Sequence, residues 1–564
     1  MKIKALITSL CVLGFVAVPS FAATSARSDQ GRIDQISSET QALQKELANL
    51  RREVAQLKQQ KKNAPQQPIR HVKARHPITG QPTVTVTSST YAPMNATANS
   101  STPNATPIVS DNAPMGRGRS QMDRLLQSYL QNLPLDWDNP GQSFVSIGPY
   151  INTTIQFSGG QLIVNDPKIN TDVALLKLRK AAYEGMAAKG VHTGEDTHHS
   201  HLLLSGILEG QGQYIQYGQQ GGNLGAGNNG TSSNVDLSAA ELDAFLLSPS
   251  PWVSGFFSFS YDNGTEPTET NSRVLDSRVF LNNAFIMIGD FTKSSFYGTV
   301  GQYYVPFGTY SSVMVSSPLT KILGRTKARA ILAGYQGQTE NAFYTSVYAF
   351  KGDSHTSATS RINNGGVNIG YRFDIPCPDF NGDIGVGYIG NIADSVGMQN
   401  TNNQPMFNGF AGPSPYGSEK IVHRVPALDV RGIVTLGDNI NLIGEYVGAT
   451  TSFNPNDLSF NAHGAKPWAM NAEAAYTFEM FTKPSSIGIG YGQAKQALAI
   501  GLPEKRASAV FNTSIWHNTI QSLEVRHDIN YAASKTGTGS GVLPAAQGLG
   551  SSDDVITLQF DLFF

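Results

Sequence analysis

Hydrophobic and polar residues alternate one by one over much of the chain after residue 200. In the segment 554–564, Leu558 and Phe560 fall on one face of an extended strand, whereas Gln559 and Asp561 fall on the opposite face. A strand with one apolar and one polar face separates two unlike surroundings. Taken alone, this segment fits a strand of a soluble sandwich as well as a strand of a membrane barrel.

The same alternation recurs along the chain. In residues 201–214, Leu204 and Tyr214 fall on the apolar face, and Glu209 and Gln213 fall on the polar face. Sixteen such segments can be counted, and most have about 10 to 14 residues, enough for a tilted strand to cross a bilayer. They begin near His201, Val235, Trp252, Arg278, Ser295, Arg325, Asn341, Gly365, Phe380, Pro426, Asn439, Pro467, Ser485, Arg506, Ile520 and Asp554.

The connections between these segments alternate in length. Long connections such as 215–234 and 393–425 follow odd-numbered segments, and short ones such as 248–251 and 437–438 follow even-numbered segments. A barrel made of hairpins has short turns on one rim and long loops on the other, whereas a soluble sandwich has no reason to keep this order. We therefore expect an all-β fold, a transmembrane antiparallel β-barrel of about 16 strands, over residues 201–564.

The residues before the barrel divide into four parts. Residues 1–22 have the basic start, apolar run and small-residue end of a signal peptide, which predicts export. Residues 31–60 carry a heptad pattern that predicts an α-helical coiled coil and a homo-oligomer, but it does not distinguish a dimer from a trimer. Residues 61–119 predict a disordered linker, and residues 120–190 predict a helix followed by a small α/β segment.

These features together predict a protein of the bacterial outer membrane. An even number of strands brings both ends of the barrel to one side, so we expect the N-terminal region in the periplasm and the long loops outside. A last strand that ends in Phe564 is typical of barrels read by the bacterial insertion machinery. Beyond the signal peptide, Cys377 is the only cysteine, so no intramolecular disulfide is expected.

Composition and charge narrow the function. A net charge of −1 with 15% charged residues indicates no nucleic-acid-binding surface. Mean hydropathy is −0.22, and no uncharged apolar run of 18 residues follows the signal, so helical membrane spans are not expected. No residue spacing indicates a catalytic group or a cofactor site, so we expect no enzyme. Sixteen strands enclose enough lumen for an aqueous passage, which makes transport the expected function.

Several cations are candidates for contacts with a solute in that lumen. Arg325, Lys327 and Arg329 form a one-sided row with a spacing of about 7 Å in an extended strand, which favours an anionic solute such as a carboxylate-rich chelate. The further candidates are Arg372, Arg431 and Arg526. Salt bridges to lumenal carboxylates are the alternative role for each of the six residues.

A histidine-rich stretch raises the question of a metal site. It contains His192, His198, His199 and His201, with Glu195 and Asp196 between them. Imidazole and carboxylate groups bind metals, but this stretch has no flanking structure to fix a coordination geometry. A solvated spacer is therefore the favoured interpretation, and no metal site is predicted.

Three short motifs resemble a known family. Leu162–Pro167 (LIVNDP), Leu175–Lys180 (LLKLRK) and Val305–Gly308 (VPFG) are similar to motifs of the outer-membrane iron-uptake barrels, the family that includes the Legionella siderophore receptor LbtU and the Francisella proteins FupA and FslE. The resemblance covers roughly Gly141 to Phe564. It implies uptake of a ferric siderophore, a polycarboxylate of the legiobactin type, and supplies no binding residues.

The expected function is thus an outer-membrane receptor or channel for a ferric siderophore. A TonB-type plug is not expected, because the export signal is followed by a coil and a tether and the strand count is sixteen. A general or anion-preferring porin is the first alternative, and a surface-structural or adhesive barrel is the second. Tight, saturable binding of one ferric siderophore would separate the receptor from the porin.

Overall fold

The computed structural model describes most of the chain beyond residue 143. The described residues are 144–146, 156–158, 161–163, 169–188, 200–218, 230–248, 250–262, 278–339, 341–357, 361–375, 380–399, 407, 409–410, 419–437, 439–481, 483–516, 518–539 and 546–564. The signal peptide, coiled coil and linker expected in residues 1–119 lie outside them, as does the histidine-rich stretch 192–199.

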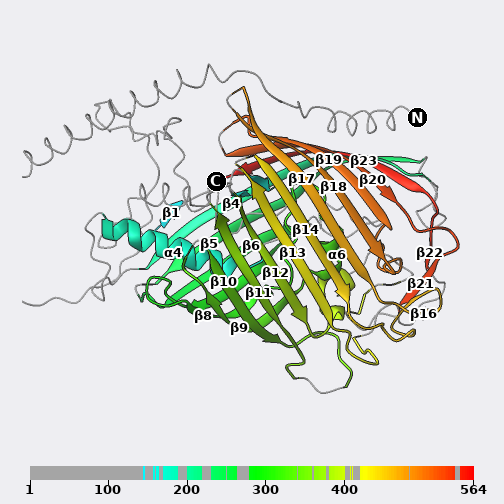
Figure 1. Ribbon diagram of the computed structural model, residues 1–564, viewed down its shortest axis with the longest axis horizontal. Coiled ribbons are helices and arrows are strands. Elements are labelled where there is room, and N and C mark those ends of the chain that lie inside the picture. Colours follow the sequence, from blue (N-terminus) through cyan, green and yellow to red (C-terminus); the bar gives the residue numbers. More distant parts are fainter. Residues whose placement is uncertain are drawn as a thin grey trace, which may run out of the picture. The chain divides into compact units, whose positions relative to one another are not determined.

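Sixteen antiparallel strands form a closed barrel (Figure 1). Each strand pairs with the next along the chain, and β23 pairs with β4 to close the ring. The strands are β4 (His201–Gln216), β5 (Thr231–Leu247), β6 (Val253–Asp262), β7 (Arg278–Ile288), β8 (Phe296–Tyr304), β9 (Lys327–Gln336), β10 (Ala342–Phe350), β11 (Asn364–Ile375), β12 (Phe380–Ile389), β13 (Ala427–Leu436), β14 (Ile440–Ala449), β17 (Trp468–Met480), β18 (Lys483–Lys495), β19 (Lys505–Thr513), β20 (Thr519–Ile529) and β23 (Ser552–Phe563). The predicted fold class is confirmed, and each predicted strand begins within four residues of an observed one.

The two faces of the barrel wall differ as the alternation predicts. On β23, Leu558 and Phe560 are 62% and 42% exposed on the outer face, whereas Gln559 and Asp561 are buried on the inner face. A closed ring leaves no unpaired strand edge, and an apolar outer band is what a bilayer requires of such a ring. The barrel therefore spans a membrane. In the described part of the chain, no helix has the length and apolar character to cross one.

The two rims of the barrel differ in the length of their connections. One rim carries short turns such as 376–379 and 481–482, and we call it the short-turn rim. The other carries connections such as 390–426 and 530–551, and we call it the long-loop rim. The connection 390–426 includes η2 (Ile392–Asp394) and α7 (Val396–Gln399).

Several long connections fold together at the long-loop rim. A small sheet joins the β14–β17 and β20–β23 connections and consists of β15 (Leu458–Phe460), β16 (His463–Gly464), β21 (Thr536–Gly539) and β22 (Ala546–Gln547). Phe410 lies between Phe407 and Phe453 with ring centroids 5.0 and 5.6 Å away, and all three rings are fully buried. The long loops therefore have an apolar core of their own.

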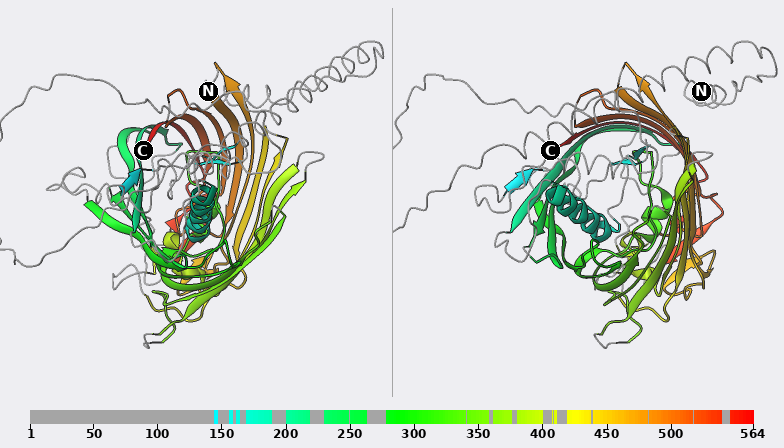
Figure 2. Two further views of the ribbon diagram at one scale, coloured as in Figure 1. Left: turned by 90° about the vertical axis from the view of Figure 1, so that its left-hand side faces the viewer. Right: turned by 60° about the vertical axis from the view of Figure 1, so that its left-hand side comes forward.

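Elements from the N-terminal side of the barrel lie within it. Figure 2 shows α4 (Thr171–Ala188) inside the ring of strands. The hairpin of β2 (Gln156–Ser158) and β3 (Gln161–Ile163) contacts β18. The short strand β1 (Phe144–Ser146) instead pairs in parallel with the start of β4. The helix and small α/β segment expected in residues 120–190 are described only in part, and the described helix α4 lies in the lumen.

Candidate functional site

The connection between β8 and β9, residues 305–326, runs into the lumen, and we call it the inserted segment. Its residues Val313 and Met314 are buried and pack against Ile443 of β14 and Val510 of β19. These strands lie across the lumen from β8 and β9 in the strand order. The inserted segment therefore lines the opposite wall and narrows the passage.

Glycines on the inner face of β18 allow this close approach. A Cβ atom at Gly488 would lie 2.7 Å from Val313 Cγ2, and one at Gly492 would lie 3.1 Å from Leu319 Cδ1. Leu319 begins α6 (Leu319–Gly324), the short helix within the inserted segment. A side chain at either glycine would push the segment away from the wall.

A carboxylate on β14 binds the beginning of the inserted segment. Glu445 Oε1 accepts the N–H groups of Thr309 at 2.7 Å and Tyr310 at 3.1 Å. Its Oε2 accepts the hydroxyl of Thr320 at 2.9 Å. Burial of a carboxylate is costly unless donors surround it, and here three groups of one segment supply them.

Two more carboxylates continue this row around the wall. Glu473 on β17 accepts the hydroxyl of Ser312 at 2.6 Å and the N–H of Val313 at 2.8 Å. Glu524 on β20 accepts the N–H of Ser316 at 2.8 Å and its hydroxyl at 2.5 Å. Glu445, Glu473 and Glu524 thus fix the inserted segment to three strands, and we call them the carboxylate row.

An arginine anchors the segment beyond this row. Arg506 on β19 donates through Nη1 to the carbonyl of Ser317 at 2.9 Å. The same guanidinium binds both oxygens of Asp528 on β20, at 2.7 and 3.0 Å. Because a bidentate pair fixes the plane of the guanidinium, the third donor is aimed at the segment.

The helix α4 occupies another sector of the lumen, against β6 to β10. Leu175, Leu176 and Leu178 are buried in the same core as Tyr297 and Phe350 of the wall. Burial of three leucines contributes roughly 2 to 3 kcal/mol each. The helix is therefore a built-in lining of the barrel.

Polar contacts fix both ends of α4. Near its start, Asp172 Oδ2 accepts the hydroxyl of Thr299 on β8 at 2.8 Å. Burial raises the pKa of the Asp172 carboxyl, and the bond from Thr299 opposes this. Towards its end, the buried Arg179 donates to the carbonyls of Ser250 and Val253 at the short-turn rim, the latter at 2.8 Å. The helix thus begins inside the lumen and ends at the short-turn rim.

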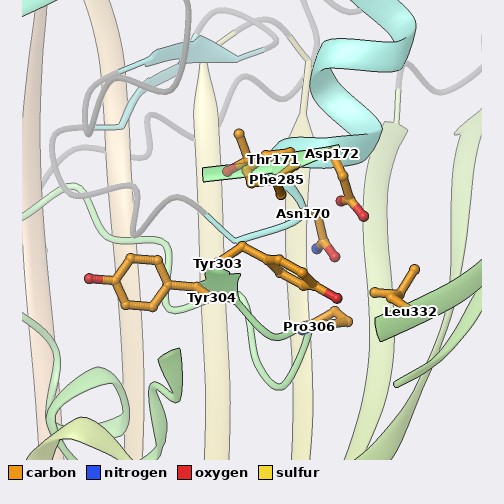
Figure 3. Close-up of a pocket in the computed structure, with 8 residues that line it drawn as sticks. All are labelled: Asn170, Thr171, Asp172, Phe285, Tyr303, Tyr304, Pro306 and Leu332. Carbon is orange, nitrogen blue, oxygen red and sulfur yellow. The ribbon is translucent and has the colours of Figure 1, made fainter. Parts of the chain in front are cut away.

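The two lumenal elements meet at a small cavity (Figure 3). Asn170 and Asp172 at the start of α4 line it together with Pro306 of the inserted segment and Tyr303 of β8. Its volume is about 10 Å³, which is room for one water molecule at most. The inserted segment and α4 therefore form one continuous obstruction.

A polar sector of the wall lies beside this obstruction, on β23, β4 and β5. Gln213 donates to Gln211 at 3.0 Å, Gln211 donates to Gln559 at 3.1 Å, and Gln559 donates to Asp561 at 3.0 Å. Asp561 pairs in register with Glu209 across the β23–β4 seam. The inward side chains of β4 in this sector are half-buried, as is Glu241 on β5. The inward groups of this sector are carboxyl and amide groups, and we call it the polar sector.

Three of the predicted arginines do face the lumen. Arg372 lies 3.6 Å from Asp383, and Arg526 lies 3.2 Å from Asp528. Arg431 is buried and pairs with Asp429. The alternative of lumenal salt bridges therefore describes the position of all three arginines, whereas their contact with a solute stays a prediction.

The predicted row of Arg325, Lys327 and Arg329 lies at the start of β9 and just before it, near the long-loop rim. On β9, Lys327 and Arg329 share a face with Ile331, which is 57% exposed on the outer surface, whereas Leu332 points inward to the cavity at α4. The guanidinium of Arg325 stacks on Tyr304, which lines the cavity at α4. Lys327 donates to Asn282, and the Asn282 amide donates to the lumenal Glu241. Strand alternation thus groups Arg329 with the outward Ile331, whereas Lys327 reaches a partner of the lumenal Glu241, and contact of this row with a solute stays a prediction.

Two of the three motifs that suggested a family resemblance belong to the lumenal elements, and LIVNDP lies mostly outside the described residues. LLKLRK is the buried stretch of α4, and VPFG opens the inserted segment with Val305 and Phe307 fully buried. Gly308 has φ of +85°, and a Cβ there would lie 2.3 Å from the ring of Tyr310. No chemical role follows from these two motifs in the sequence alone, and in the structure they fill the interior of the barrel.

No metal centre is found in the part of the chain that the structure describes. Within it, no three His, Cys, Asp or Glu side chains are grouped closely enough to hold an ion. The stretch 192–199 lies outside that part, so its role stays as the sequence leaves it.

Comparison with known proteins gives the relationship of the chain. No family model matches it. A UPF0422 protein of Coxiella burnetii is 41% identical over 425 residues, which cover 75% of this chain and 84% of that protein. The chain belongs to the UPF0422 family. A UPF0422 protein of Legionella pneumophila strain Lens is 38% identical over 424 residues, 74% of this chain and 76% of that protein.

The names of these UPF0422 relatives state no solute, so the resemblance to siderophore receptors stays a prediction. Among solved structures, the outer membrane channel DcaP of Acinetobacter baumannii is 13% identical and has a TM-score of 0.41 over 65% of this chain and 97% of that one. The anion-selective porin from Comamonas acidovorans is 10% identical and has a TM-score of 0.39, with 65% of this chain and all of that one covered.

Proposed function

We propose that this UPF0422 protein is an outer-membrane channel narrowed for small hydrophilic solutes. The main support for this proposal is the carboxylate row, which fixes the inserted segment to β14, β17 and β20 inside a closed barrel. Together with α4, this segment leaves the polar sector as the hydrated part of the lumen. A small polar solute, rather than a bulky one, suits such a passage.

The orientation follows from the position of α4. Arg179 near the end of α4 binds the turn at Ser250, so the helix leaves the lumen at the short-turn rim, where β4 begins. We infer that this rim faces the periplasm and that the long-loop rim faces outward, as in barrels with short periplasmic turns.

The charge of the lumen does not favour an anion. Arg372, Arg431 and Arg526 are each beside an aspartate, and the polar sector contributes carboxyl and amide groups. We therefore infer a passage that prefers neutral solutes or cations over anions. The reversal potential of the purified protein in a planar bilayer with a salt gradient tests this, and a clear anion preference would contradict it.

A ferric siderophore as the solute is the finer proposal, and it depends on the family resemblance. The inserted segment and α4 both occupy the lumen, so the passage of a bulky ferric chelate would require one of them to move. Uptake of radioactive ferric siderophore by cells with and without the gene tests this proposal. Equal uptake by the two kinds of cell would contradict the siderophore proposal but not the narrowed channel. If the protein also showed no conductance, a surface-structural barrel would be favoured.

A further inference from the structure

Three lysines lie close together at the long-loop rim, on strands that Figure 1 shows side by side. Lys466 lies just before β17, Lys495 ends β18 and Lys505 begins β19, and we call them the lysine cluster. Lys505 pairs in register with Gln493, so Lys495 is its diagonal neighbour, roughly 7 to 8 Å away between Cα atoms. The Lys466 N–H donates to the side chain of Gln496 at 2.7 Å, which fixes Lys466 beside the end of β18.

The outer face of β18 carries the central lysine of this cluster. The ladders of β18 to both neighbouring strands have no register shift, so its odd-numbered residues from 487 to 495 share one face. On that face Ile487, Ile489 and Tyr491 are 50%, 54% and 41% exposed, as in the apolar band of a barrel. The opposite face carries Gly488 and Gly492, which lie against the inserted segment in the lumen. Lys495 therefore extends from the outer wall.

The strands on either side agree with this orientation. Lys505 pairs with the outer face of β18, whereas the next residue, Arg506, binds the inserted segment inside the barrel. Trp468 of β17 also pairs with that outer face, and Lys466 lies two residues before it. Between and beyond them, Ala469 is fully buried on the inner face. All three lysines thus have the alternation of the surface that meets lipid.

Aromatic rings place the lysine cluster at the edge of the bilayer. Lys495 Nζ is 5.5 Å from the centroid of the Trp468 ring, which lies 5.8 Å from the ring of the exposed Tyr446. Near the other end of β17, Tyr476 and Phe478 stack with centroids 6.0 Å apart. From Trp468 to Phe478 the strand is roughly 34 Å long, and with a tilt of about 40° it rises about 26 Å, the height of an apolar band. Trp468 therefore marks the outer headgroup level.

The lysine cluster has no carboxylate partner in the part of the chain that the structure describes. None of its three amines forms an ion pair there, whereas the lumenal Arg372, Arg431 and Arg526 each lie beside an aspartate. Glu504 precedes Lys505, but its carbonyl accepts the N–H of the inward Ala494, so it belongs to the inner face. Cations at the edge of a bilayer without a protein counter-charge attract anionic headgroups.

Small side chains leave room for acyl chains below the lysine cluster. Tyr491 of β18 pairs with Ala472 of β17 and with Ala507 of β19, and both alanines are exposed. In the next outward row, Ala474 and Ala509 flank β18 in the same way. The larger side chains of β18 thus stand between two shallow grooves that lead from the lysines into the apolar band.

We propose that the lysine cluster binds the phosphate groups of a phosphorylated glycolipid in the outer leaflet. Lysine amines attract phosphate as point charges, and their long apolar stems let the amines reach the headgroups. Three amines spread over three strands suit two phosphate groups better than one, and the grooves beside β18 suit the acyl chains. The inference rests on the proposed orientation, which puts the long-loop rim at the outer leaflet, and it does not depend on the solute that the channel carries.

The test uses the full-length protein in detergent and measures lipid binding by native mass spectrometry. The probes are lipid A with both phosphates, lipid A stripped of phosphate, phosphatidylglycerol and inorganic phosphate. The variant K495Q/K505Q loses two charges of the cluster, and K495R/K505R keeps them. The control K293Q/K483Q loses two charges near the short-turn rim, where Lys293 and Lys483 lie in or beside short turns.

We expect K495Q/K505Q to bind lipid A with both phosphates about tenfold more weakly than the wild type. The arginine variant and the control should match the wild type. Equal binding by K495Q/K505Q and wild type, or absence of lipid A binding by the wild type, would overturn the proposal. Equally tight binding of the stripped lipid or of phosphatidylglycerol would overturn it as well, and so would displacement of lipid A by an equal concentration of inorganic phosphate.

Two further measurements keep this test separate from the channel function. Circular dichroism of K495Q/K505Q should show the strand content of the wild type, because both lysines lie outside the core. Its bilayer conductance should also equal that of the wild type, because the cluster lies on the outer wall. If the wild type showed no conductance, the channel would be contradicted, and the comparison of lipid binding would still decide the present proposal.

Discussion

Glu524 on β20 accepts both the backbone N–H and the hydroxyl of Ser316, at 2.8 and 2.5 Å. Ser316 belongs to the connection between β8 and β9, so this contact joins opposite sides of one barrel. A carboxylate that satisfies two donors of a single residue fixes the position of that residue as well as its distance. The width of the lumen therefore depends on a few buried acids.

Removal of an acid from the carboxylate row should widen the passage. In the Glu473→Ala variant, the Ser312 hydroxyl and the Val313 N–H lose their acceptor, which should lower the free energy of unfolding by about 2 to 4 kcal/mol. We expect the steady single-channel conductance in a planar bilayer to rise. Glu479→Ala is the matched control, because this exposed residue of the same strand lies near the short-turn rim. Equal conductance of both variants would show that the inserted segment does not limit flow.

The glycines of β18 give an independent test of the close approach. Gly488→Ala places a methyl group where Val313 lies, and we expect a loss of about 1 to 3 kcal/mol in the free energy of unfolding. Gly444→Ala on β14 is the control, because nothing lies within 4 Å of the added atom. Urea unfolding in detergent compares the two variants, and similar losses in both would contradict the packing.

Arg179 and Lys180 are adjacent cations of α4, and substituting each in turn distinguishes the anchoring of the helix from the effect of its charge. Arg179→Met removes the donors to the Ser250 and Val253 carbonyls from a buried position, which should cost about 3 kcal/mol or more. Lys180→Met removes an exposed amine that binds Gln338, so its cost should stay below about 1 kcal/mol. Hydrogen exchange of the α4 amides measures the difference. Fast exchange in the Arg179 variant alone is the expected result.

The long loops should pack more firmly as the pH falls through 6. Burial raises the pKa of Asp394 to about 6, and its carboxyl accepts the Ser354 N–H at 2.8 Å and the Asn364 amide at 2.7 Å. Because the folded pKa lies above the unfolded value, the contribution to stability is complete below about pH 4 and is lost as the pH rises to about 6. The Ser354 amide should exchange more slowly at pH 4.5 than at pH 7 after correction for intrinsic exchange. Asp394→Asn should abolish this difference.

Substitution of lumenal and outer cations should separate the two surfaces. Arg526→Gln removes a charge beside Asp528 and should shift the selectivity further towards cations. Arg329→Gln removes an outer charge and should leave the selectivity unchanged. Reversal potentials in a salt gradient measure both variants. A shift of the reversal potential in Arg329→Gln would show that Arg329 lines the passage.

The sequence predicts the barrel because a strand between lipid and water needs alternation, and alternation is visible without tertiary contacts. Alternation alone does not assign the charged residues of β9 to one surface. The inward face of this strand carries Ala330 and Gly334, which are small because α4 and Tyr297 pack against the wall there. Without knowledge of that packing, alternation does not show whether the charged face of the strand meets water or lipid.

The position of the inserted segment also could not be predicted from the sequence. The inward orientation of Glu445, Glu473 and Glu524 follows from strand alternation, but their partners lie more than 120 residues away in a connection without any period. A hydrogen-bonded loop leaves no pattern in the chain because its backbone donors are the same for every residue type. Only the run of glycines in β18 marks the wall that receives it.

The seam between β23 and β4 also sets an order of events during folding. It joins the first and last strands of the ring, and β1 extends the same edge of β4 where β23 stops. Contacts of such long sequence separation form slowly. We expect α4 and the inserted segment to enter while the sheet is still an open trough, so that closing the seam encloses them. The narrow lumen would then be a product of assembly itself, present from the first moment the ring exists.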